Sequence, residues 1–195
     1  MEKLDADYWT ERYKSENTGW DTSEITTPLR EYFDQLTDRK LKILIPGAGK
    51  AHEAGYLWDK GFKDVYVLDW SPVPLENFSA KYPEFPKNQL IQSDFFEFKG
   101  QFDRIIEQTF FCAFEPELRK DYARKIPDLL KEKGALVGLL WNNELSSAGP
   151  PFGGTAEEYK ALFSPYLSID IMEESYNSIK PRAGRELFIK MSKKT

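Results

Sequence analysis

The fold class of this chain can be predicted from residues 41–69, LKILIPGAGKAHEAGYLWDKGFKDVYVLD. The first five of these residues are mostly apolar and lead into Pro46 and Gly47, a pattern typical of a buried strand that ends at a tight turn. Residues 51–60 have a helical pattern, and DVYVLD is a short β-branched run that ends on Asp69. The segment therefore predicts a strand, a helix and a second strand.

The alternation of strands and helices continues along the rest of the chain. The further predicted elements are a helix after Pro72, strands near 89–92 and at 102–106, a helix at 116–131, a strand at 135–141, one more helix, and strands near 167–172 and 186–191. This order predicts a parallel sheet covered by helices on both faces, with an antiparallel ending. Right-handed crossovers place the carboxyl ends of parallel strands along one edge, where ligands bind near the reversal of strand order.

The length of 195 residues fits one medium-sized domain. We expect residues 40–195 to form the α/β core and residues 1–39, called the N-terminal segment below, to carry two helices. This segment contains the aromatic residues Trp9, Tyr13 and Trp20. It is too long to serve only as a lead-in to the first strand, so a separate role is expected for it.

The composition excludes several classes of partner. The net charge of −5 disfavours nucleic acid, because binding to phosphates needs clustered Lys and Arg. No apolar run approaches the roughly 20 residues of a membrane-spanning helix, and MEKLDAD lacks the features of a signal peptide, so we expect a cytoplasmic protein. With Cys112 as the single cysteine and His52 as the single histidine, we expect neither a disulfide nor a metal site. We also expect a monomer.

The loop PGAGK, residues 46–50, joins the first predicted strand to its helix. Glycines let a ligand approach the backbone, and a helix N-terminus offers free N–H donors. The loop lacks the pattern of a nucleoside triphosphate site, because no glycine stands five residues before Gly49 and Ala51 replaces the required serine or threonine. It also lacks the third glycine of the dinucleotide fingerprint, whose place His52 occupies. Both ligand classes are therefore disfavoured.

Acidic residues follow the next two predicted strands. Asp69 ends the second strand about twenty residues after the glycines, where a carboxylate can accept both hydroxyls of a ribose. Asp94 follows the third strand beside Phe95, and an acid next to a ring suits the amino group and ring face of adenine. The alternative is structural, with Asp94 capping a turn and Phe95 in the core. With the glycine loop, these acids indicate an adenosine-containing cofactor.

Further motifs occur in a definite order along the chain. They are YWTERY, TGWD at 18–21, TPL at 27–29, ILIPGAGK, VYVLDWS, SDFF, FDRIIEQTFFCAFEPELRKDYA and GPPF at 149–152. Over residues 8–163, their order and spacing resemble the thiopurine S-methyltransferase superfamily, and within it the plant and bacterial thiol or halide methyltransferases. The resemblance implies a Rossmann-like class I fold with a mostly parallel seven-stranded sheet, an antiparallel C-terminal strand and an N-terminal helical lid. It also implies S-adenosylmethionine as the cofactor.

The resemblance implies which residues contact the cofactor. The aromatic residues that close over the cofactor in the thiol and halide enzymes correspond to Trp9, Tyr13 and Trp20. Aromatic faces attract a sulfonium cation, and rings exclude water from the reaction. The alternative is an amphipathic helix that its aromatic residues pin to the core. The other implied cofactor residues are Gly47 and Gly49 in the glycine loop, Asp69 at the ribose, Asp94 and Phe95 at the adenine, and Gln108 lining the site.

The segment after the fourth strand departs from the family pattern. Where thiol and halide methyltransferases carry Asp and then Tyr, this chain has Glu107 and Gln108. Because that tyrosine borders the reacting centre in those relatives, the change bears on acceptor specificity. Arg119 matches an arginine near the acceptor of thiopurine-type enzymes, and with Phe152 of the GPPF motif it is predicted to bind the acceptor. The alternative for Arg119 is an exposed helix residue paired with a nearby acid.

The predicted activity is methyl transfer to a small soft nucleophile: a thiol, thiopurine-like, halide or metalloid acceptor. Such an in-line displacement needs alignment and desolvation rather than a catalytic triad, and no catalytic residue is predicted. His52 is predicted to cap or pack at a helix start, and Cys112 to be a buried inert thiol. Two alternatives stay open: an inactive cofactor-binding member of the fold and an NAD-dependent oxidoreductase.

Overall fold

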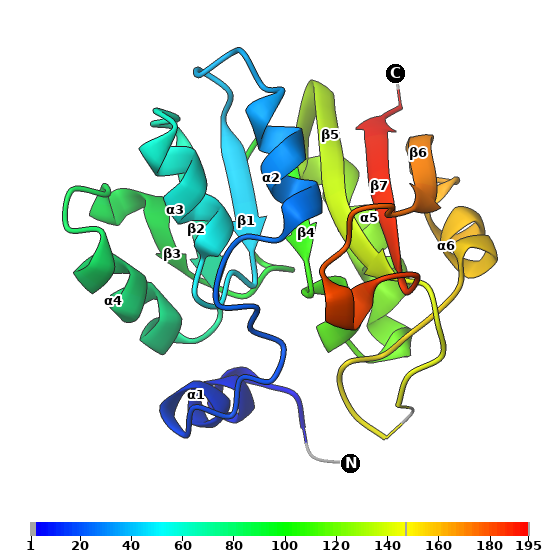
Figure 1. The fold of residues 1–195 in the computed structure, drawn as a ribbon, viewed down its shortest axis with the longest axis horizontal. Coiled ribbons are helices and arrows are strands. Elements are labelled where there is room, and N and C mark those ends of the chain that lie inside the picture. Colours follow the sequence, from blue (N-terminus) through cyan, green and yellow to red (C-terminus); the bar gives the residue numbers. More distant parts are fainter. Residues whose placement is uncertain (1–2, 147, 195) are drawn as a thin grey trace.

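The computed structural model describes residues 3–146 and 148–194, which contain a seven-stranded sheet in the order β3-β2-β1-β4-β5-β7-β6 (Figure 1). The strands are β1 (Ile43–Pro46), β2 (Val65–Asp69), β3 (Leu90–Gln92), β4 (Phe102–Gln108), β5 (Leu130–Trp141), β6 (Leu167–Glu174) and β7 (Glu186–Lys193). Neighbouring strands from β3 to β5 pair in parallel, whereas β7 runs antiparallel to β5 and β6. The predicted mostly parallel sheet with an antiparallel C-terminal strand is confirmed.

Helices cover both faces of the sheet. They are α1 (Ala6–Lys14), α2 (Thr27–Asp34), α3 (His52–Asp59), α4 (Pro72–Lys81), α5 (Arg119–Leu129) and α6 (Ala156–Phe163). Residues of α2, α3 and α4 belong to the apolar core on one face, and residues of α5 and α6 to the core on the other. Helix α1 lies apart from both layers, beyond the end of β1 and next to α4 (Figure 1).

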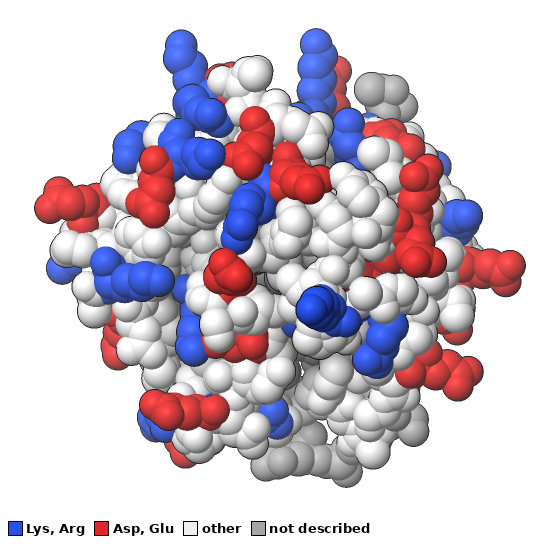
Figure 2. All heavy atoms as spheres, viewed as in Figure 1, with Lys and Arg blue, Asp and Glu red and all other residues white. Residues whose placement is uncertain are grey.

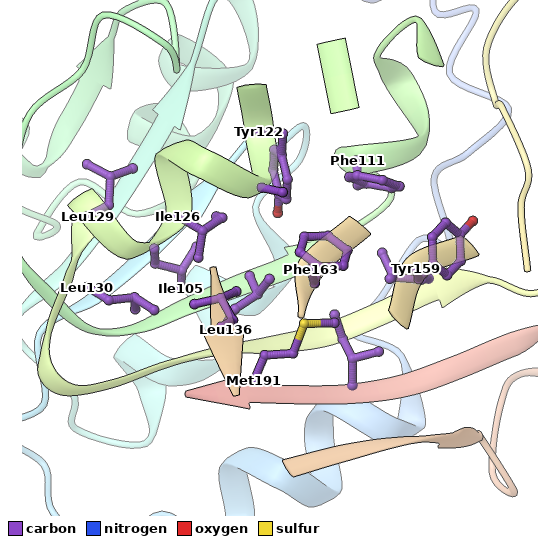
Figure 3. Close-up of a cluster of buried hydrophobic side chains, with 14 of the residues drawn as sticks. Ile105, Phe111, Tyr122, Ile126, Leu129, Leu130, Leu136, Tyr159, Phe163 and Met191 are labelled. Atoms are coloured by element: carbon purple, nitrogen blue, oxygen red, sulfur yellow. The ribbon is translucent and has the colours of Figure 1, made fainter. Parts of the chain in front are cut away.

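Successive residues of a strand point to opposite faces and so enter different cores. In β1, Ile43 and Ile45 pack with residues of α2 and α3, whereas Leu44 packs with residues of α5 and α6. Figure 3 shows this second core, in which Tyr122 of α5 and Phe163 of α6 lie over the sheet. Because both faces are covered, the strands read as continuous apolar runs in the sequence.

The boundary between α5 and β5 differs from the prediction. The helix expected to end at residue 131 ends at Leu129, and β5 begins at Leu130 rather than at residue 135. Leu130 is fully buried and pairs with Phe102 at the start of β4. Strand pairing and burial therefore decide this boundary, against the local helical pattern.

The order of the strands reverses between β1 and β4. From β1 the chain adds β2 and β3 on one side, then continues on the other side with β4 and β5. Such a reversal leaves a crevice at the carboxyl ends of the strands. Helix α1, the loop after β5 and the turn before β7 all lie at this edge of the sheet (Figure 1).

Acidic and basic side chains are interspersed over the face of the molecule drawn in Figure 2. Such a pattern gives that face no continuous basic track for a phosphate backbone. Within the described residues, no helix has the length and apolar character needed to cross a membrane.

Candidate active site

A cavity of about 660 Å³ opens at the carboxyl edge of the sheet, a size typical of ligand sites. The sequence-predicted residues that line it are Trp9, Tyr13, Trp20, Gly47, Asp69, Asp94 and Phe95. Gly49 and Gln108 line a smaller cavity of about 40 Å³, which shares Tyr13, Trp20 and Gly47 with the large one. The fold thus brings together the residues predicted to contact the cofactor.

The glycine loop presents its backbone to the cavity. Gly47 and Gly49 have φ angles of +58° and +51°, in the left-handed region that favours glycine. A Cβ atom on Gly47 would lie 1.9 Å from the ring of Phe110, so any side chain there would displace the ring. The space beside Gly49 is bounded by the hydroxyl of Tyr13, 3.6 Å from a Cβ position. Glycine is therefore required at the first of these positions by both backbone angle and packing.

Asp69, the last residue of β2, is a buried acid with 4% of its surface exposed. Its Oδ1 accepts a hydrogen bond from the Ser71 amide at 2.9 Å, and its Oδ2 accepts from the Gly49 amide at 3.3 Å and the Tyr13 hydroxyl at 3.5 Å. Burial raises the pKa of Asp69 to about 6, although the two amides act in the opposite direction. Since each carboxylate oxygen has two acceptor positions, these three bonds leave one position, on Oδ1, for a ligand hydroxyl.

Asp94 and Phe95 line the cavity and also have structural contacts. Asp94 Oδ1 accepts from the Phe96 amide at 2.8 Å, which closes a turn after β3. Phe95 is 3% exposed and stacks on Tyr122 with ring centroids 5.3 Å apart. Asp94 therefore caps a turn and Phe95 packs in the core, which are the structural roles considered as the alternative to cofactor binding. Contact of the two residues with adenine stays a prediction.

The aromatic residues of the N-terminal segment form a wall over the cavity. The ring of Trp20 meets Trp9 and Tyr13 edge to face, with centroids 5.6 Å and 5.9 Å apart. The Arg12 guanidinium lies 5.1 Å from the Trp20 ring centroid. Helix α1, which carries three of these four residues, has no buried residue. Trp9 and Tyr13 are partly buried, and a lid role for the segment stays a prediction.

Asp21 fastens the N-terminal segment to the glycine loop. Its Oδ2 lies 2.5 Å from Lys50 Nζ, and its Oδ1 lies 2.8 Å from His52 Nε2. The single histidine is thus engaged with the N-terminal segment at the start of α3, in keeping with the packing role predicted for it. These contacts hold the loop around Trp20 against the cavity.

Arg182, which the sequence reasoning missed, fastens the same segment from the other side of the cavity. Its Nη2 donates to the Trp20 carbonyl at 2.8 Å, and its Nη1 lies 3.2 Å from Glu186 Oε1 in a buried ion pair. The guanidinium also lies 5.3 Å from the Trp141 ring centroid. Since Arg182 and Trp20 are 162 positions apart, only the fold reveals this contact.

Glu107 organises the turn after β4. This fully buried acid accepts hydrogen bonds from the amides of Phe110 and Phe111 at 2.8 Å and 2.9 Å, and from the Tyr122 hydroxyl at 2.7 Å. Burial raises the pKa of Glu107 to about 7, although these three bonds lower it. Because the turn carries Phe110 over Gly47, the acid shapes the cavity without lining it.

Gln108 faces the small cavity with an unpaired amide group. Its Oε1 accepts from the Thr26 hydroxyl at 3.2 Å, whereas its buried Nε2 has no hydrogen-bond partner among the described residues. Buried polar atoms nearly always have a partner, so this donor is available to a polar group in the cavity.

Arg119 and Phe152 are not among the residues that line either cavity. Arg119 Nη2 donates to the Phe152 carbonyl at 3.0 Å, and the Phe152 amide donates to the Cys112 carbonyl at 2.8 Å. These bonds fasten the loop after β5, whose Pro150 and Pro151 do line the large cavity. Direct contact of Arg119 and Phe152 with the acceptor stays a prediction.

The half of the cavity beside β5 and β7 combines the prolines of the GPPF motif, Pro150 and Pro151, with residues that the sequence did not single out. These are Trp141, Pro181 and Arg182. Cys112 also lines the cavity, and burial raises its pKa to about 12, in keeping with an inert thiol. Trp141 ends β5, whereas Pro181 and Arg182 lie in the turn before β7, so no local motif joins these three residues.

Solved methyltransferase structures share the fold. The 1,6-didemethyltoxoflavin-N1-methyltransferase of Burkholderia thailandensis, solved with S-adenosylhomocysteine, superposes with a TM-score of 0.80 at 15% identity, covering 97% of this chain and 87% of that one. The magnesium protoporphyrin IX methyltransferase of Synechocystis PCC 6803 superposes with a TM-score of 0.75 at 13% identity, covering 97% of each chain. The predicted Rossmann-like class I fold is thereby confirmed.

Curated relatives cover most of the chain. Probable thiol methyltransferase 2 of Arabidopsis thaliana is 28% identical, covering 91% of this chain and 81% of the relative. Thiocyanate methyltransferase 1 of Brassica oleracea is 28% identical, covering 95% and 84%. Thiopurine S-methyltransferase of Acinetobacter baylyi is 25% identical, covering 88% and 89%. The model of the thiopurine S-methyltransferase family matches residues 4–193, and the chain therefore belongs to that family.

Proposed function

We propose that this protein transfers the methyl group of S-adenosylmethionine to a small thiol with an apolar body. The observation that carries the proposal is one cavity in which Asp69, Asp94 and the glycine loop meet an apolar wall beside β5 and β7. The names of the curated relatives, which are thiol, thiocyanate and thiopurine methyltransferases, support the same reaction class.

The polar groups of the site fit this cofactor. Asp69 would accept a ribose hydroxyl, Asp94 with Phe95 would hold the adenine, and the orphaned Gln108 Nε2 offers a donor beside the glycine loop. When bound, the cofactor would supply a methyl group activated by its sulfonium charge, which an acceptor thiolate takes up in line with S-adenosylhomocysteine as the leaving group. The rings of Trp9 and Trp20 would favour the sulfonium charge and keep water away from it.

The acceptor half of the cavity favours an apolar thiol. Strand order puts Trp141 and the Pro150–Pro151 loop on the opposite side of β1 and β4 from Asp69 and Asp94. A wall of proline and indole can bury a hydrocarbon or aromatic body, whereas a bare halide ion would leave it uncovered. Burial raises the pKa of Cys112 in this wall to about 12, so its thiol stays neutral and does not take a proton from the acceptor. We therefore expect the acceptor to bind as the thiolate that the acceptor itself forms in solution.

The proposal is tested by calorimetry and by a transfer assay with labelled cofactor. We expect binding of S-adenosylhomocysteine and S-adenosylmethionine, no binding of NAD or ATP, and transfer to aromatic or alkyl thiols ahead of iodide and metalloid anions. Tight NAD binding with no response to S-adenosylhomocysteine would overturn the proposal in favour of an oxidoreductase. Cofactor binding without transfer to any acceptor would identify an inactive member of the family.

Substitution of Asp69 should weaken cofactor binding and make the affinity for the cofactor independent of pH near 6. Asp69→Ala removes a charge-assisted bond to the ribose, and we expect about a tenfold to hundredfold loss of affinity for S-adenosylhomocysteine. Because ribose hydroxyls donate, they prefer the ionised acid. Burial raises the pKa of Asp69 to about 6, so wild-type affinity should fall as the pH drops through 6.

Asp69→Asn is the matched control for this pH effect, since it keeps the shape of the side chain and cannot ionise. Calorimetry between pH 5 and pH 8 should give a flat affinity profile for Asp69→Asn. An Asp69→Ala variant that binds as tightly as wild type would show that another group holds the ribose.

A further inference from the structure

Thr109, the residue that follows β4, has a backbone angle that β-branched residues rarely adopt. Its φ is +57°, in the left-handed region that favours glycine. The other non-glycine residues with positive φ within residues 3–146 and 148–194 are Glu16, Ser23 and Ala51, none of which is β-branched. A left-handed angle costs a branched residue free energy, and such strain persists only where the surrounding structure holds the residue in place.

The surrounding turn holds Thr109 from both sides. Glu107 Oε1 accepts hydrogen bonds from the amides of Phe110 and Phe111 at 2.8 Å and 2.9 Å, so the chain turns back at Thr109. Phe111 is buried in the core, and the ring of Phe110 packs against Gly47. Because the residues on either side are fixed, the backbone at Thr109 cannot relax to a more favourable angle.

The side chain of Thr109 adds a further constraint. Its Oγ1 donates to the Gln108 carbonyl at 2.7 Å, and the branch at Cβ leaves few side-chain rotamers. Glycine would adopt the same φ without strain, but it would supply neither the hydroxyl nor the branch. A threonine at this position therefore lowers the stability of the turn and raises its rigidity.

The turn after β4 lies where the two halves of the large cavity meet. In the sheet order, β4 stands between β1 and β5, with Asp69 and Asp94 on one side and Trp141 on the other. Thr109 lines both the large and the small cavity. A methyl group that passes from a cofactor on the β2 side to an acceptor on the β5 side therefore crosses beside Thr109.

We propose that Thr109 is a positioning residue for methyl transfer, which keeps the turn after β4 rigid so that the acceptor sulfur lies in line with the methyl–sulfonium bond. The inference rests on the proposed function. In that reaction the sulfur of the acceptor thiolate forms a bond to the methyl carbon as the carbon–sulfonium bond breaks, and S-adenosylhomocysteine leaves. Because the reacting atoms must keep a narrow geometry, a small shift of this turn lowers the rate without a loss of cofactor affinity.

Thr109→Gly tests the proposal, because glycine relieves the backbone strain and removes the constraint of the side chain. We expect the denaturation midpoint to stay the same or rise and the affinity for S-adenosylhomocysteine, measured by calorimetry, to stay the same. We expect kcat to fall by about tenfold to a hundredfold. Amide hydrogen exchange over residues 107–111 should become faster. Thr109→Ser keeps the hydroxyl and should recover part of the rate.

Glu16→Gly is the control for the relief of strain, because Glu16 has a φ of +55° and is an exposed residue that lines neither cavity. This variant should gain stability and keep the kcat of wild type. An unchanged kcat in Thr109→Gly, with an active wild type, would overturn the inference alone. A parallel loss of stability and cofactor affinity in Thr109→Gly would show that Thr109 is purely structural. A wild type that transfers methyl to no acceptor would overturn the proposed function and the inference with it.

Discussion

Removal of residues 1–22 should abolish methyl transfer while leaving a folded core. Residues 3–22 contain no buried residue, so their loss removes little of the apolar core. They do carry Trp9, Tyr13 and Trp20, which form the wall over the cavity. Without this wall, water reaches the reacting centre and the acceptor is no longer aligned, so we expect a loss of at least about a hundredfold in rate.

Thermal unfolding with and without S-adenosylhomocysteine, run on the full and truncated chains, measures this effect. The truncated chain should unfold cooperatively and gain much less stability from the ligand than the full chain does. The double substitution Glu11→Ala and Lys14→Ala is the control, because it removes an exposed ion pair of α1 and leaves the aromatic wall unchanged. Full activity after truncation would contradict the lid, and aggregation of the truncated chain would favour the alternative in which the aromatic residues complete the core.

Glu107→Leu should cause the largest loss of stability among single substitutions near the site. The change leaves the amides of Phe110 and Phe111 and the hydroxyl of Tyr122 buried without their acceptor. Each orphaned donor costs about 1–3 kcal/mol, so the free energy of unfolding should fall by about 3 kcal/mol or more. Chemical denaturation at pH 6 measures this loss.

Glu107→Gln separates the role of the carboxylate charge from its role as a hydrogen-bond acceptor, because the amide has no charge and keeps one oxygen in nearly the same place. In wild type, burial raises the pKa of Glu107 above its ordinary value of 4.5 to about 7. The folded state therefore holds this proton more tightly than the unfolded state, and its contribution to stability is lost as the pH rises through 7. Glu107→Gln should accordingly gain stability relative to wild type between pH 5 and pH 8. A difference that does not change with pH would mean that Glu107 is ionised throughout.

The placement of Glu107 also answers a question that the sequence raised. In place of the Asp–Tyr pair of the thiol and halide enzymes, this chain has Glu107 and Gln108, and the two side chains lie in different surroundings. Glu107 faces the core and holds a turn, whereas Gln108 faces the small cavity. Because successive residues of a strand point to opposite sides, one step in sequence separates a structural acid from an amide that faces the cavity.

The alternation of parallel strands and helices in the first half of the fold, and the residues that follow those strands, could be predicted from the sequence alone. Glycines at 47 and 49, Asp69 and Asp94 each follow a recognisable apolar run, and parallel strands necessarily deliver their carboxyl ends to one edge. Local pattern and topology rules were sufficient there, because each residue's position depends only on the end of its own strand.

The half of the cavity beside β5 and β7 and the fastening of the N-terminal segment follow only from the tertiary structure. Arg182 reaches Trp20 across 162 positions, and Arg119 fastens the Phe152 loop instead of lining the cavity. These contacts depend on which loops become neighbours when β5 and β7 pair, and that pairing leaves no periodic signal in the residues that meet.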